Sequence, residues 1–366
     1  MTASLDAHRA AFDAALAETL ADGRARAVAT GPESTELWDA AVECLGGGKM
    51  LRPRILLSAA EGLTGSRGLA ECVRAAAVRI AVALELLHFA FLLHDDVIDG
   101  DLSRRGGPNL IGVLRARSGG MSPRGRSDGA SSVPPAARLH WARSAAILVG
   151  DLMLSTAHGL LGRLDLPASA RERILDLVAE STAHTVAGEN LDVLLADGLH
   201  ETGILGILEM EFLKTGSYSI ALPLRLAAVL AGRTDLDDAL VAAGRRLGTA
   251  YQLQDDLLST FGDPAAHGKD ALSDLREGKQ TVLIALARRT PHWERISARF
   301  GAADLDAADA ATIRAALEAG GARDEVERMI AEAIEDARRL LRAADLPAEA
   351  RDVLDALIAA LTDRSS

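Results

Sequence analysis

The sequence predicts an all-α protein, and three observations support this fold class. Apolar residues recur three and four positions apart, as in Ile174, Leu177 and Val178, which is the spacing of one helix face. The alternating Val, Ile and Thr patterns of strands are scarce, and aromatic residues make up only 3% of the chain. With 366 residues, 49% hydrophobic and 25% charged, the chain can bury a substantial core. We therefore expect long helices packed around an apolar interior.

The expected helices follow one another along the chain. Residues 1–23 form an acidic amphipathic segment without the uninterrupted apolar run of a signal peptide. Long helical patterns then cover residues 69–101, 138–164, 168–195 and 235–261. Glycine and proline predict turns at residues 46–48, 106–108 and 262–264. The most apolar window, residues 75–93, contains Arg79, Glu85 and His88, so we expect a buried helix and no membrane-spanning segment.

One segment differs from the rest in composition. Residues 118–137 are rich in Gly, Ser and Pro, which predicts a disordered surface insertion. Because the helical pattern resumes on both sides, and the acidic motifs described below lie in different halves of the chain, we expect residues 1–366 to form a single domain that carries this insertion.

Charge and cysteine content restrict the function classes. The net charge is −12, so nothing in the overall composition favours nucleic acid or an anionic membrane surface as a partner. The two cysteines, Cys44 and Cys72, form neither a metal-ligand spacing nor a disulfide framework. A reducing cytoplasm is the expected location.

The segment LLHDDVIDGD places three acids at the end of a long apolar run. On a helix, Asp95 and Asp99 are four residues apart and share a face, and Asp96 lies beside them. Such like charges call for a compensating cation, and oxygen ligands on a rigid helix suit Mg²⁺, which also binds phosphate oxygens. A solvated acidic helix end is the alternative interpretation, because acids are common on helix surfaces.

A second acidic pair favours the metal interpretation. Asp255 and Asp256 close another apolar helix, in YQLQDDLL. Basic residues stand in loop-like contexts elsewhere in the chain: Lys49, Arg52, Arg104, Arg105, Lys214, Lys269 and Lys279. Paired carboxylates together with Lys and Arg predict a site for diphosphates, some held through metal ions and some held directly.

Motifs in a fixed order give the chain a family resemblance. They are GGKMLRP, ELLH, HDDVID, SRRGGP, GD at 150–151, GEN at 188–190, KT at 214–215, YQLQDD, GK at 268–269 and LREGKQT, and they run from Gly47 to Thr281. Together they resemble the trans-polyprenyl diphosphate synthase family, which elongates allylic diphosphates with isopentenyl diphosphate. The resemblance implies the isoprenoid synthase fold, a bundle of antiparallel helices around a central apolar cavity.

The resemblance also implies a role for each matching residue. Asp95, Asp96, Asp99, Asp255 and Asp256 would hold up to three Mg²⁺ ions on the allylic diphosphate, near Arg104, Lys214, Lys269 and Lys279. Lys49, Arg52, His88 and Arg105 would receive isopentenyl diphosphate, and Thr215 and Gln252 would lie near the developing carbocation. The expected catalytic set is Asp95, Asp96, Lys214, Thr215, Gln252 and Asp255. A dimethylallyl, geranyl or farnesyl starter would suit this chemistry.

Two positions depart from the family pattern. Met50 follows Lys49 where a basic residue is usual, and Ser259 stands where the second motif commonly has Asp. Product length is expected to depend on Phe91, one turn before Asp95, whose ring limits elongation, whereas Ala90 leaves room. A product of fifteen or twenty carbons fits, and geranylgeranyl diphosphate is favoured over farnesyl diphosphate.

Two alternatives from other classes remain at this point. A class I terpene cyclase shares an aspartate-rich helix but needs no isopentenyl diphosphate site, so Lys49, Arg52 and the second acidic pair argue against it. A catalytically silent partner subunit would have lost metal-binding acids, and only Ser259 indicates such a loss. The many apolar helix faces favour a homodimer.

Overall fold

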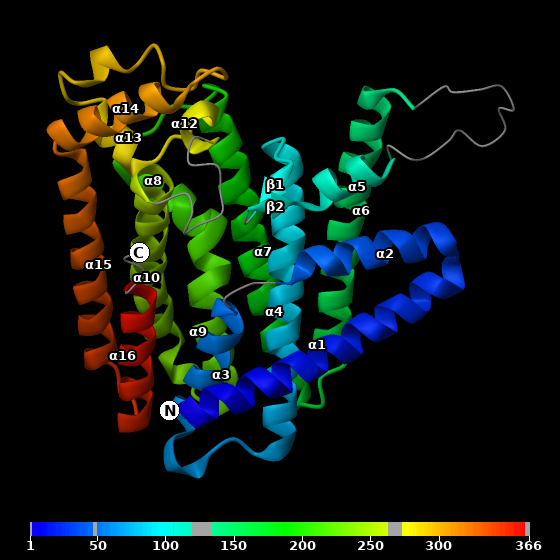
Figure 1. The fold of residues 1–366 in the computed structure, drawn as a ribbon. Helices are drawn as coiled ribbons and strands as arrows, with labels where there is room; N and C mark the ends of the chain where they lie inside the picture. The colour runs from blue at the N-terminus through cyan, green and yellow to red at the C-terminus, as the bar shows by residue number, and fades with distance from the viewer. Residues whose placement is uncertain (1, 47–49, 105, 119–132, 263–272, 363–366) are drawn as a thin grey trace, which may run out of the picture. The chain divides into compact units, whose positions relative to one another are not determined.

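The computed structural model describes residues 2–46, 50–104, 106–118, 133–262 and 273–362 (Figure 1). Apart from one two-stranded hairpin, the described residues form helices, turns and loops, so the all-α prediction is confirmed. The chain separates into two compact units, of which unit 1 comprises Met1–Pro53 and Val78–Leu164 and unit 2 comprises Arg54–Ala77 and Asp165–Ser366.

Unit 1 begins with two helices that pack against each other, α1 (Thr2–Thr30) and α2 (Pro32–Leu45) (Figure 1). Pro32 lies in the first turn of α2, where its missing N–H costs no helical hydrogen bond. The indole of Trp38 lies so close to Gly23 that any side chain there would collide with it, and its Nε1 donates to the Leu20 carbonyl at 3.2 Å. This contact fixes the crossing of the two helices.

The rest of unit 1 is built around the long apolar helix α4 (Glu71–Ile98). After α4, the short antiparallel strands β1 (Ser103–Arg104) and β2 (Gly107–Pro108) form a hairpin, with Gly106 at φ 76° in its turn. Helix α5 (Leu110–Arg117) is capped by Asn109, whose side chain accepts from the Gly112 N–H, and packs on α6 (Pro135–Gly162). The hairpin therefore returns the chain beside the carboxyl end of α4.

Unit 2 contains one continuous helical run whose middle part is a π-helix. It consists of α8 (Ile204–Glu211), the π-helix η3 (Phe212–Ala221) and α9 (Leu222–Ala231). The π-helix packs against α7 (Ala168–Ala196) and α10 (Asp237–Phe261). A Cβ at Gly248 would lie 2.8 Å from the Gly216 Cα, so α10 and the π-helix meet backbone to backbone. Short π-helical segments occur frequently at functional positions.

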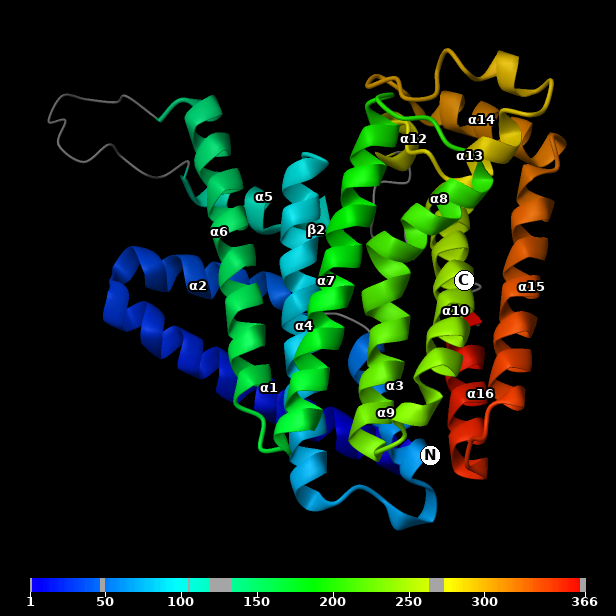
Figure 2. The same cartoon turned by 180° about the vertical axis from the view of Figure 1, so that it is seen from behind.

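The other described helices of unit 2 include one that precedes α4 and several that follow α10. They are α3 (Leu51–Thr64), which starts in unit 1, α12 (Ser273–Glu277), α13 (Val282–Ala287), α14 (Ala307–Ala319), α15 (Ala322–Ala343) and α16 (Ala348–Thr362), with 3₁₀ turns η1 (Gly65–Arg67), η4 (Thr234–Leu236) and η5 (Trp293–Arg295). Helices α10, α15 and α16 run side by side (Figure 2). Leu253 of α10, Leu283 of α13 and Ile313 of α14 belong to one buried apolar cluster.

The predicted helices agree with the observed ones to within a few residues. The segments 69–101, 138–164, 168–195 and 235–261 correspond to α4, α6, α7 and α10. The predicted insertion at 118–137 extends too far at its C-terminal end, because α6 already begins at Pro135. A proline suits the first turn of a helix. Its residues 119–132 lie outside the described part of the chain.

Two helices, α4 and α6, meet the length and composition that a membrane span would need. In α4, 67% of the apolar window is buried inside the structure, which agrees with the predicted core helix. In α6 the buried share is 39%, so part of its apolar surface is exposed. Trp141, Leu148 and Leu152 account for much of that surface.

Candidate active site

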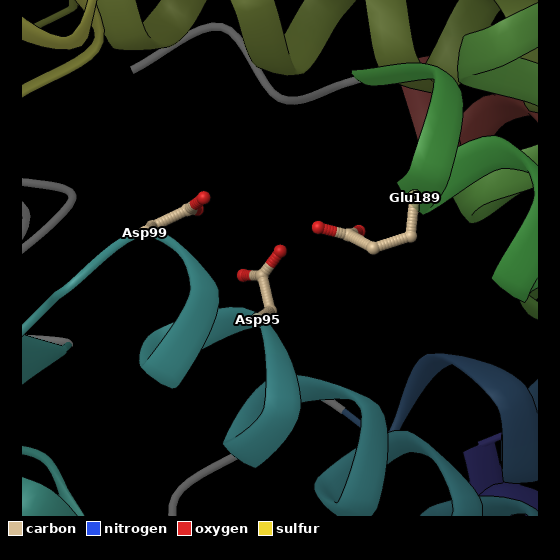
Figure 3. A group of neighbouring side chains, drawn as sticks. All are labelled: Asp95, Asp99 and Glu189. Carbon is tan, nitrogen blue, oxygen red and sulfur yellow. The ribbon is translucent and has the colours of Figure 1, made fainter. Parts of the chain in front are cut away.

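The first acidic motif lies on the last turns of α4 in unit 1. Asp95 and Asp99 project from the same side of the helix, and ligand oxygens from the two residues approach within 4.8 Å (Figure 3). Asp95 is half-buried and Asp99 exposed, whereas Asp96, on a neighbouring face, is only 2% exposed. The helix ends at Ile98, and Gly100, at φ 77°, turns the chain away. The helix therefore presents two carboxylates outward and one inward.

Arg104 of the hairpin neutralises the inward carboxylate. Its Nε and Nη2 donate to Asp96 Oδ1 at 2.9 and 2.6 Å, and Nη2 also donates to Asp95 Oδ2 at 3.0 Å. Burial raises the pKa of Asp96, and the neighbouring guanidinium of Arg104 opposes that rise. The charge-assisted bonds hold Asp95 and Asp96 in one orientation. The family resemblance predicts that Arg104 lies near a diphosphate. In this structure, which holds no diphosphate, Arg104 pairs with Asp95 and Asp96.

A cavity of about 300 Å³ lies beside this ion pair within unit 1. Its polar lining includes His88, Asp96 and Arg104, and its apolar lining includes Phe89, Leu92 and Leu110. The cavity can therefore contact both charged groups and a short hydrocarbon. Arg52, at the start of α3, is buried in the same unit.

In unit 2 the predicted Lys214 lies in the π-helix and pairs with two acids of α7. Its Nζ lies 2.9 Å from Glu189 Oε2 and 2.7 Å from Asp192 Oδ2. Gly188 makes this approach possible, because a Cβ there would collide with the Lys214 backbone. Thr215, the next residue, is half-buried. Asp192 is 7% exposed, so the lysine is held by a largely desolvated carboxylate.

The second acidic pair divides in the same way as the first. Asp255 is exposed on α10, whereas Asp256 is 4% exposed and accepts a hydrogen bond from Gln252 Nε2 at 3.0 Å on its Oδ1. Its Oδ2 receives no donor from the described residues. Burial and the nearby charge of Asp256 raise the pKa of Glu211. Burial raises the pKa of Asp256 to about 6, and the positive charge of Lys279 opposes the shift.

The structure shows the surroundings of the two residues that depart from the family pattern, Ser259 and Met50. Ser259 donates to the Asp256 carbonyl at 3.0 Å, so its hydroxyl is used within α10. Met50 is 7% exposed with φ 49°, and its side chain is part of the core. Arg54, which could have replaced a charge at position 50, is exposed and belongs to unit 2. Lys49, Arg105 and Lys269 lie outside the described residues.

Two features were missed in the sequence. Glu211 lies between the apolar Met210 and Phe212, two residues after Glu209, and an acid between two large apolar residues is the signal that could have identified it. His94 had no assigned role, yet its ring packs on Gly150 of α6, where any Cβ would collide with it, and its Nε2 lies 3.4 Å from Asp151 Oδ1. His94 therefore contacts both residues of the GD motif, Gly150 and Asp151.

Each unit offers outward acids of the kind that a hard divalent cation binds. Asp95 and Asp99 lie on α4 in unit 1, and Asp255 lies on α10 in unit 2. Carboxylate oxygens of this kind suit Mg²⁺ bound partly through water and partly through phosphate oxygens.

Comparison with known proteins gives consistent matches over most of the chain. A family model described as polyprenyl synthetase matches residues 35–318. A geranylfarnesyl diphosphate synthase from Aeropyrum pernix is 29% identical over 325 residues, covering 87% of this chain and 91% of the relative. A (2E,6E)-farnesyl diphosphate synthase from Mycobacterium tuberculosis is 29% identical over 285 residues, covering 75% of this chain and 68% of the relative.

A solved structure matches the chain along nearly its whole length. The crystal structure of a geranylgeranyl pyrophosphate synthase from Corynebacterium glutamicum, complexed with isoprenyl diphosphate and magnesium, gives a TM-score of 0.85 at 30% identity. The match covers 98% of each chain. The names of these similar proteins differ in the length of the prenyl product.

Proposed function

Because the chain belongs to the polyprenyl synthetase family, has the isoprenoid synthase fold and is a prenyltransferase, we propose that it condenses isopentenyl diphosphate with an allylic diphosphate. The observation that carries this proposal is the repeated arrangement of an outward and an inward aspartate at the ends of α4 and α10. Both units then serve one reaction, and we propose that residues 1–366 act as a single synthase domain.

Mg²⁺ is the proposed cofactor, and the magnesium bound to the Corynebacterium glutamicum enzyme supports this choice. We propose up to three ions, which Asp95, Asp96, Asp99, Asp255 and Asp256 would hold. When bound, Mg²⁺ stabilises the negative charge that develops on the departing diphosphate.

The cavity of unit 1 is the proposed position of isopentenyl diphosphate. His88 lines the cavity, and Phe89, Leu92 and Leu110 can contact the five-carbon chain. Lys49, Arg52 and Arg105 are proposed to bind the diphosphate of the same substrate, on the basis of their motifs.

Four cations are proposed to receive the allylic diphosphate: Arg104, Lys214, Lys269 and Lys279. Arg104 and Lys214 are held by carboxylates in the present structure, so each would exchange part of that pairing for phosphate oxygens. Phosphate oxygens can replace these acceptors because they also accept charge-assisted hydrogen bonds.

The reaction then proceeds by breaking the allylic C–O bond, whose electron pair leaves with the diphosphate. The allylic carbon bonds to the terminal alkene carbon of isopentenyl diphosphate, and a proton is lost from the new skeleton to the released diphosphate. Thr215 and Gln252 are proposed to face the cation with their oxygen atoms, while apolar helix faces exclude water. The amide of Gln252 is oriented by the hydrogen bond that its Nε2 donates to Asp256 at 3.0 Å.

Geranylgeranyl diphosphate is the proposed product, ahead of farnesyl diphosphate. Phe91 is half-buried one turn before Asp95, so its ring can limit the chain, whereas Ala90 is fully buried and small. The names of the relatives include synthases of fifteen-carbon and longer prenyl products, so the product length has to be measured with this enzyme itself.

A homodimer in the cytoplasm is the proposed form of the enzyme. The exposed Trp141, Leu148 and Leu152 lie seven and four residues apart on α6, which places them on one face that a second copy can cover. Cys44 and Cys72 are both free thiols, which supports a reducing compartment.

A product assay tests this function. The enzyme is incubated with Mg²⁺, isopentenyl diphosphate and dimethylallyl, geranyl or farnesyl diphosphate in turn, and prenyl chain length is resolved after dephosphorylation. We expect a twenty-carbon product from every starter, and a Phe91→Ala variant should extend it. A fifteen-carbon limit would overturn the length assignment, and no elongation with any starter would favour the cyclase or the silent subunit.

A further inference from the structure

A small cluster of hydroxyl and imidazole groups joins α7 to the π-helix within unit 2, and the reaction described above does not use it. The Oγ atoms of Ser181 on α7 and Ser217 on the π-helix lie 3.2 Å apart, and each residue is only 4% exposed. Nδ1 of His184, one turn further along α7, lies 3.2 Å from the same Ser217 Oγ. Burying such polar groups is unfavourable unless they bond to one another, so packing alone does not explain them.

The three groups of this cluster can satisfy one another. A serine hydroxyl has one hydrogen to donate and two lone pairs that accept, and a neutral imidazole has one ring nitrogen that accepts. Ser181 can therefore donate to Ser217, and Ser217 can donate to Nδ1 of His184, so that both hydroxyl hydrogens reach an acceptor. Because hydrogen bonds have a preferred direction, Ser217 is held in one orientation relative to α7.

The closest contacts of the π-helix with its neighbours are made at glycines. At Gly188 of α7 a Cβ would lie 2.1 Å from the Lys214 N atom, and at Gly248 of α10 a Cβ would lie 2.8 Å from the Gly216 Cα. Helices normally hold their rotation through ridges of side chains that fit into grooves, and bare backbone at a glycine presents no such ridge. The hydrogen bonds of Ser217 supply the direction that these contacts lack.

The backbone pattern around Ser217 shows why its orientation matters. The Leu222 N–H donates to the Ser217 carbonyl, five residues back, instead of the four-residue step of an α-helix. Pro223 follows and has no N–H, so it cannot form the α-helical bond to the Ser219 carbonyl. A change between the π and α patterns shifts the chain by one residue, which turns the residues on one side by about 100° about the helix axis.

Lys214 and Thr215 lie on the π-helix just before Ser217, so such a turn would change the direction in which they face. Lys214 Nζ is 2.7 Å from Asp192 Oδ2, but the flexible lysine stem can follow a moving backbone, so this ion pair does not fix the helix by itself. We propose that Ser217 is a positioning residue: its bonds to Ser181 and His184 fix the register of the π-helix and thereby the direction of Lys214 and Thr215. The inference rests on the proposed roles of Lys214 and Thr215 in the reaction.

Paired substitutions separate hydrogen bonding from packing. Ser217→Ala removes the hydroxyl with little change in volume. His184→Asn keeps a hydrogen-bonding atom near the place of Nδ1, whereas His184→Leu removes it. Thr182→Ala is the matched control, because Thr182 lies beside Ser181 on α7 but its Oγ1 donates to the Val178 carbonyl of the same helix at 2.8 Å.

Two readouts are measured at a temperature at which thermal unfolding shows every variant to be folded. The first is the rate at which acetic anhydride acetylates Lys214, followed by peptide mass spectrometry, and it needs neither substrate nor turnover. The side chain of Lys214 is 16% exposed in its ion pairs, so a displaced lysine should react faster. The second readout is kcat, together with KM for each diphosphate.

We expect Ser217→Ala and His184→Leu to raise the acetylation rate of Lys214 about three- to tenfold, since each loses a hydrogen bond that opposes local opening. Their kcat should fall by about tenfold or more, because small displacements of reacting groups are costly. KM for isopentenyl diphosphate should not change, since its proposed site lies in unit 1. His184→Asn and Thr182→Ala should stay within about threefold of the wild type in both readouts.

Wild-type acetylation and kcat in Ser217→Ala would overturn the proposal, as would equal losses in His184→Asn and His184→Leu. A wild type that makes no product, with variants that still show the expected acetylation rates, would count against the proposed function alone.

Ser181→Ala is the second test if Ser217→Ala does not fold. It removes the hydroxyl bond between the two helices and leaves Ser217 in place. Lys214 acetylation should rise by about threefold, the effect of one lost hydrogen bond, while Thr182→Ala at the neighbouring position should not raise it. Equal acetylation rates in Ser181→Ala and Thr182→Ala would contradict the proposal.

Discussion

At the scale of single residues, consecutive aspartates take different tasks because the helix points them in different directions. Neighbouring positions on an α-helix are rotated by about 100°, so one acid of a pair faces outward while the next faces the core. Asp96 is neutralised by Arg104, and Asp256 accepts a hydrogen bond from Gln252. Each outward aspartate is thus anchored by the buried partner that follows it in the sequence.

A different aspartate should set part of the pH dependence of stability. Asp237, in the first turn of α10, accepts from Arg225 Nε at 2.8 Å and from Arg173 Nη2 at 2.6 Å. The hydrogen bond from Arg225, opposed by partial burial, lowers the pKa of Asp237. A lowered folded-state pKa means that this stabilisation is present at neutral pH and is lost as the pH falls through the folded pKa.

We therefore expect Asp237→Asn to lower the free energy of unfolding at pH 7 by about 1–2 kcal/mol, and by much less near pH 3. Urea denaturation at the two pH values measures the difference. Asp238→Asn, in the same turn but exposed, is the control and should change little. An equal loss at both pH values would contradict the electrostatic explanation.

At the scale of elements, long helices could be predicted from the sequence and short or irregular ones could not. The ranges of α4, α6, α7 and α10 follow from apolar spacing that persists over many turns. The π-helix from Phe212 to Ala221 has no comparable mark, because one extra residue per turn leaves local composition unchanged. Strands of two residues, such as Ser103–Arg104, are too short for any alternation to show.

The exposed apolar face of α6 is the expected interface between two copies of the chain. Leu148 is 63% exposed, and burying such a side chain contributes about 1.5–3 kcal/mol. A charge there should prevent association of two copies. We expect Leu148→Glu to sediment as a monomer and the wild type as a dimer, with Leu199→Glu, a change in the loop after α7, remaining dimeric. A dimeric Leu148→Glu would exclude this face as the interface.

At the scale of the whole molecule, the sequence predicted the chemistry better than the contacts that support it. The acids and most cations could be named from ordered motifs, because their residue types are what Mg²⁺ and diphosphate require. Their partners could not be predicted: the pairing of Arg104 with Asp96, or of Lys214 with Asp192, depends on how distant segments pack. Glu211 was missed for the same reason, since only its burial distinguishes it from the neighbouring Glu209.

We propose that the outward aspartates bind the metal that activates the allylic diphosphate. The variant Asp95→Ala tests this role, with Mg²⁺-dependent elongation, Mn²⁺ binding and thermal unfolding measured on one preparation. Asp95 is half-buried near the surface, so the fold should be retained, while elongation should fall by at least about a thousandfold and Mn²⁺ affinity should decrease. The exposed Asp324→Ala on α15 should behave as the wild type. Full elongation and unchanged Mn²⁺ binding in Asp95→Ala would contradict the metal assignment.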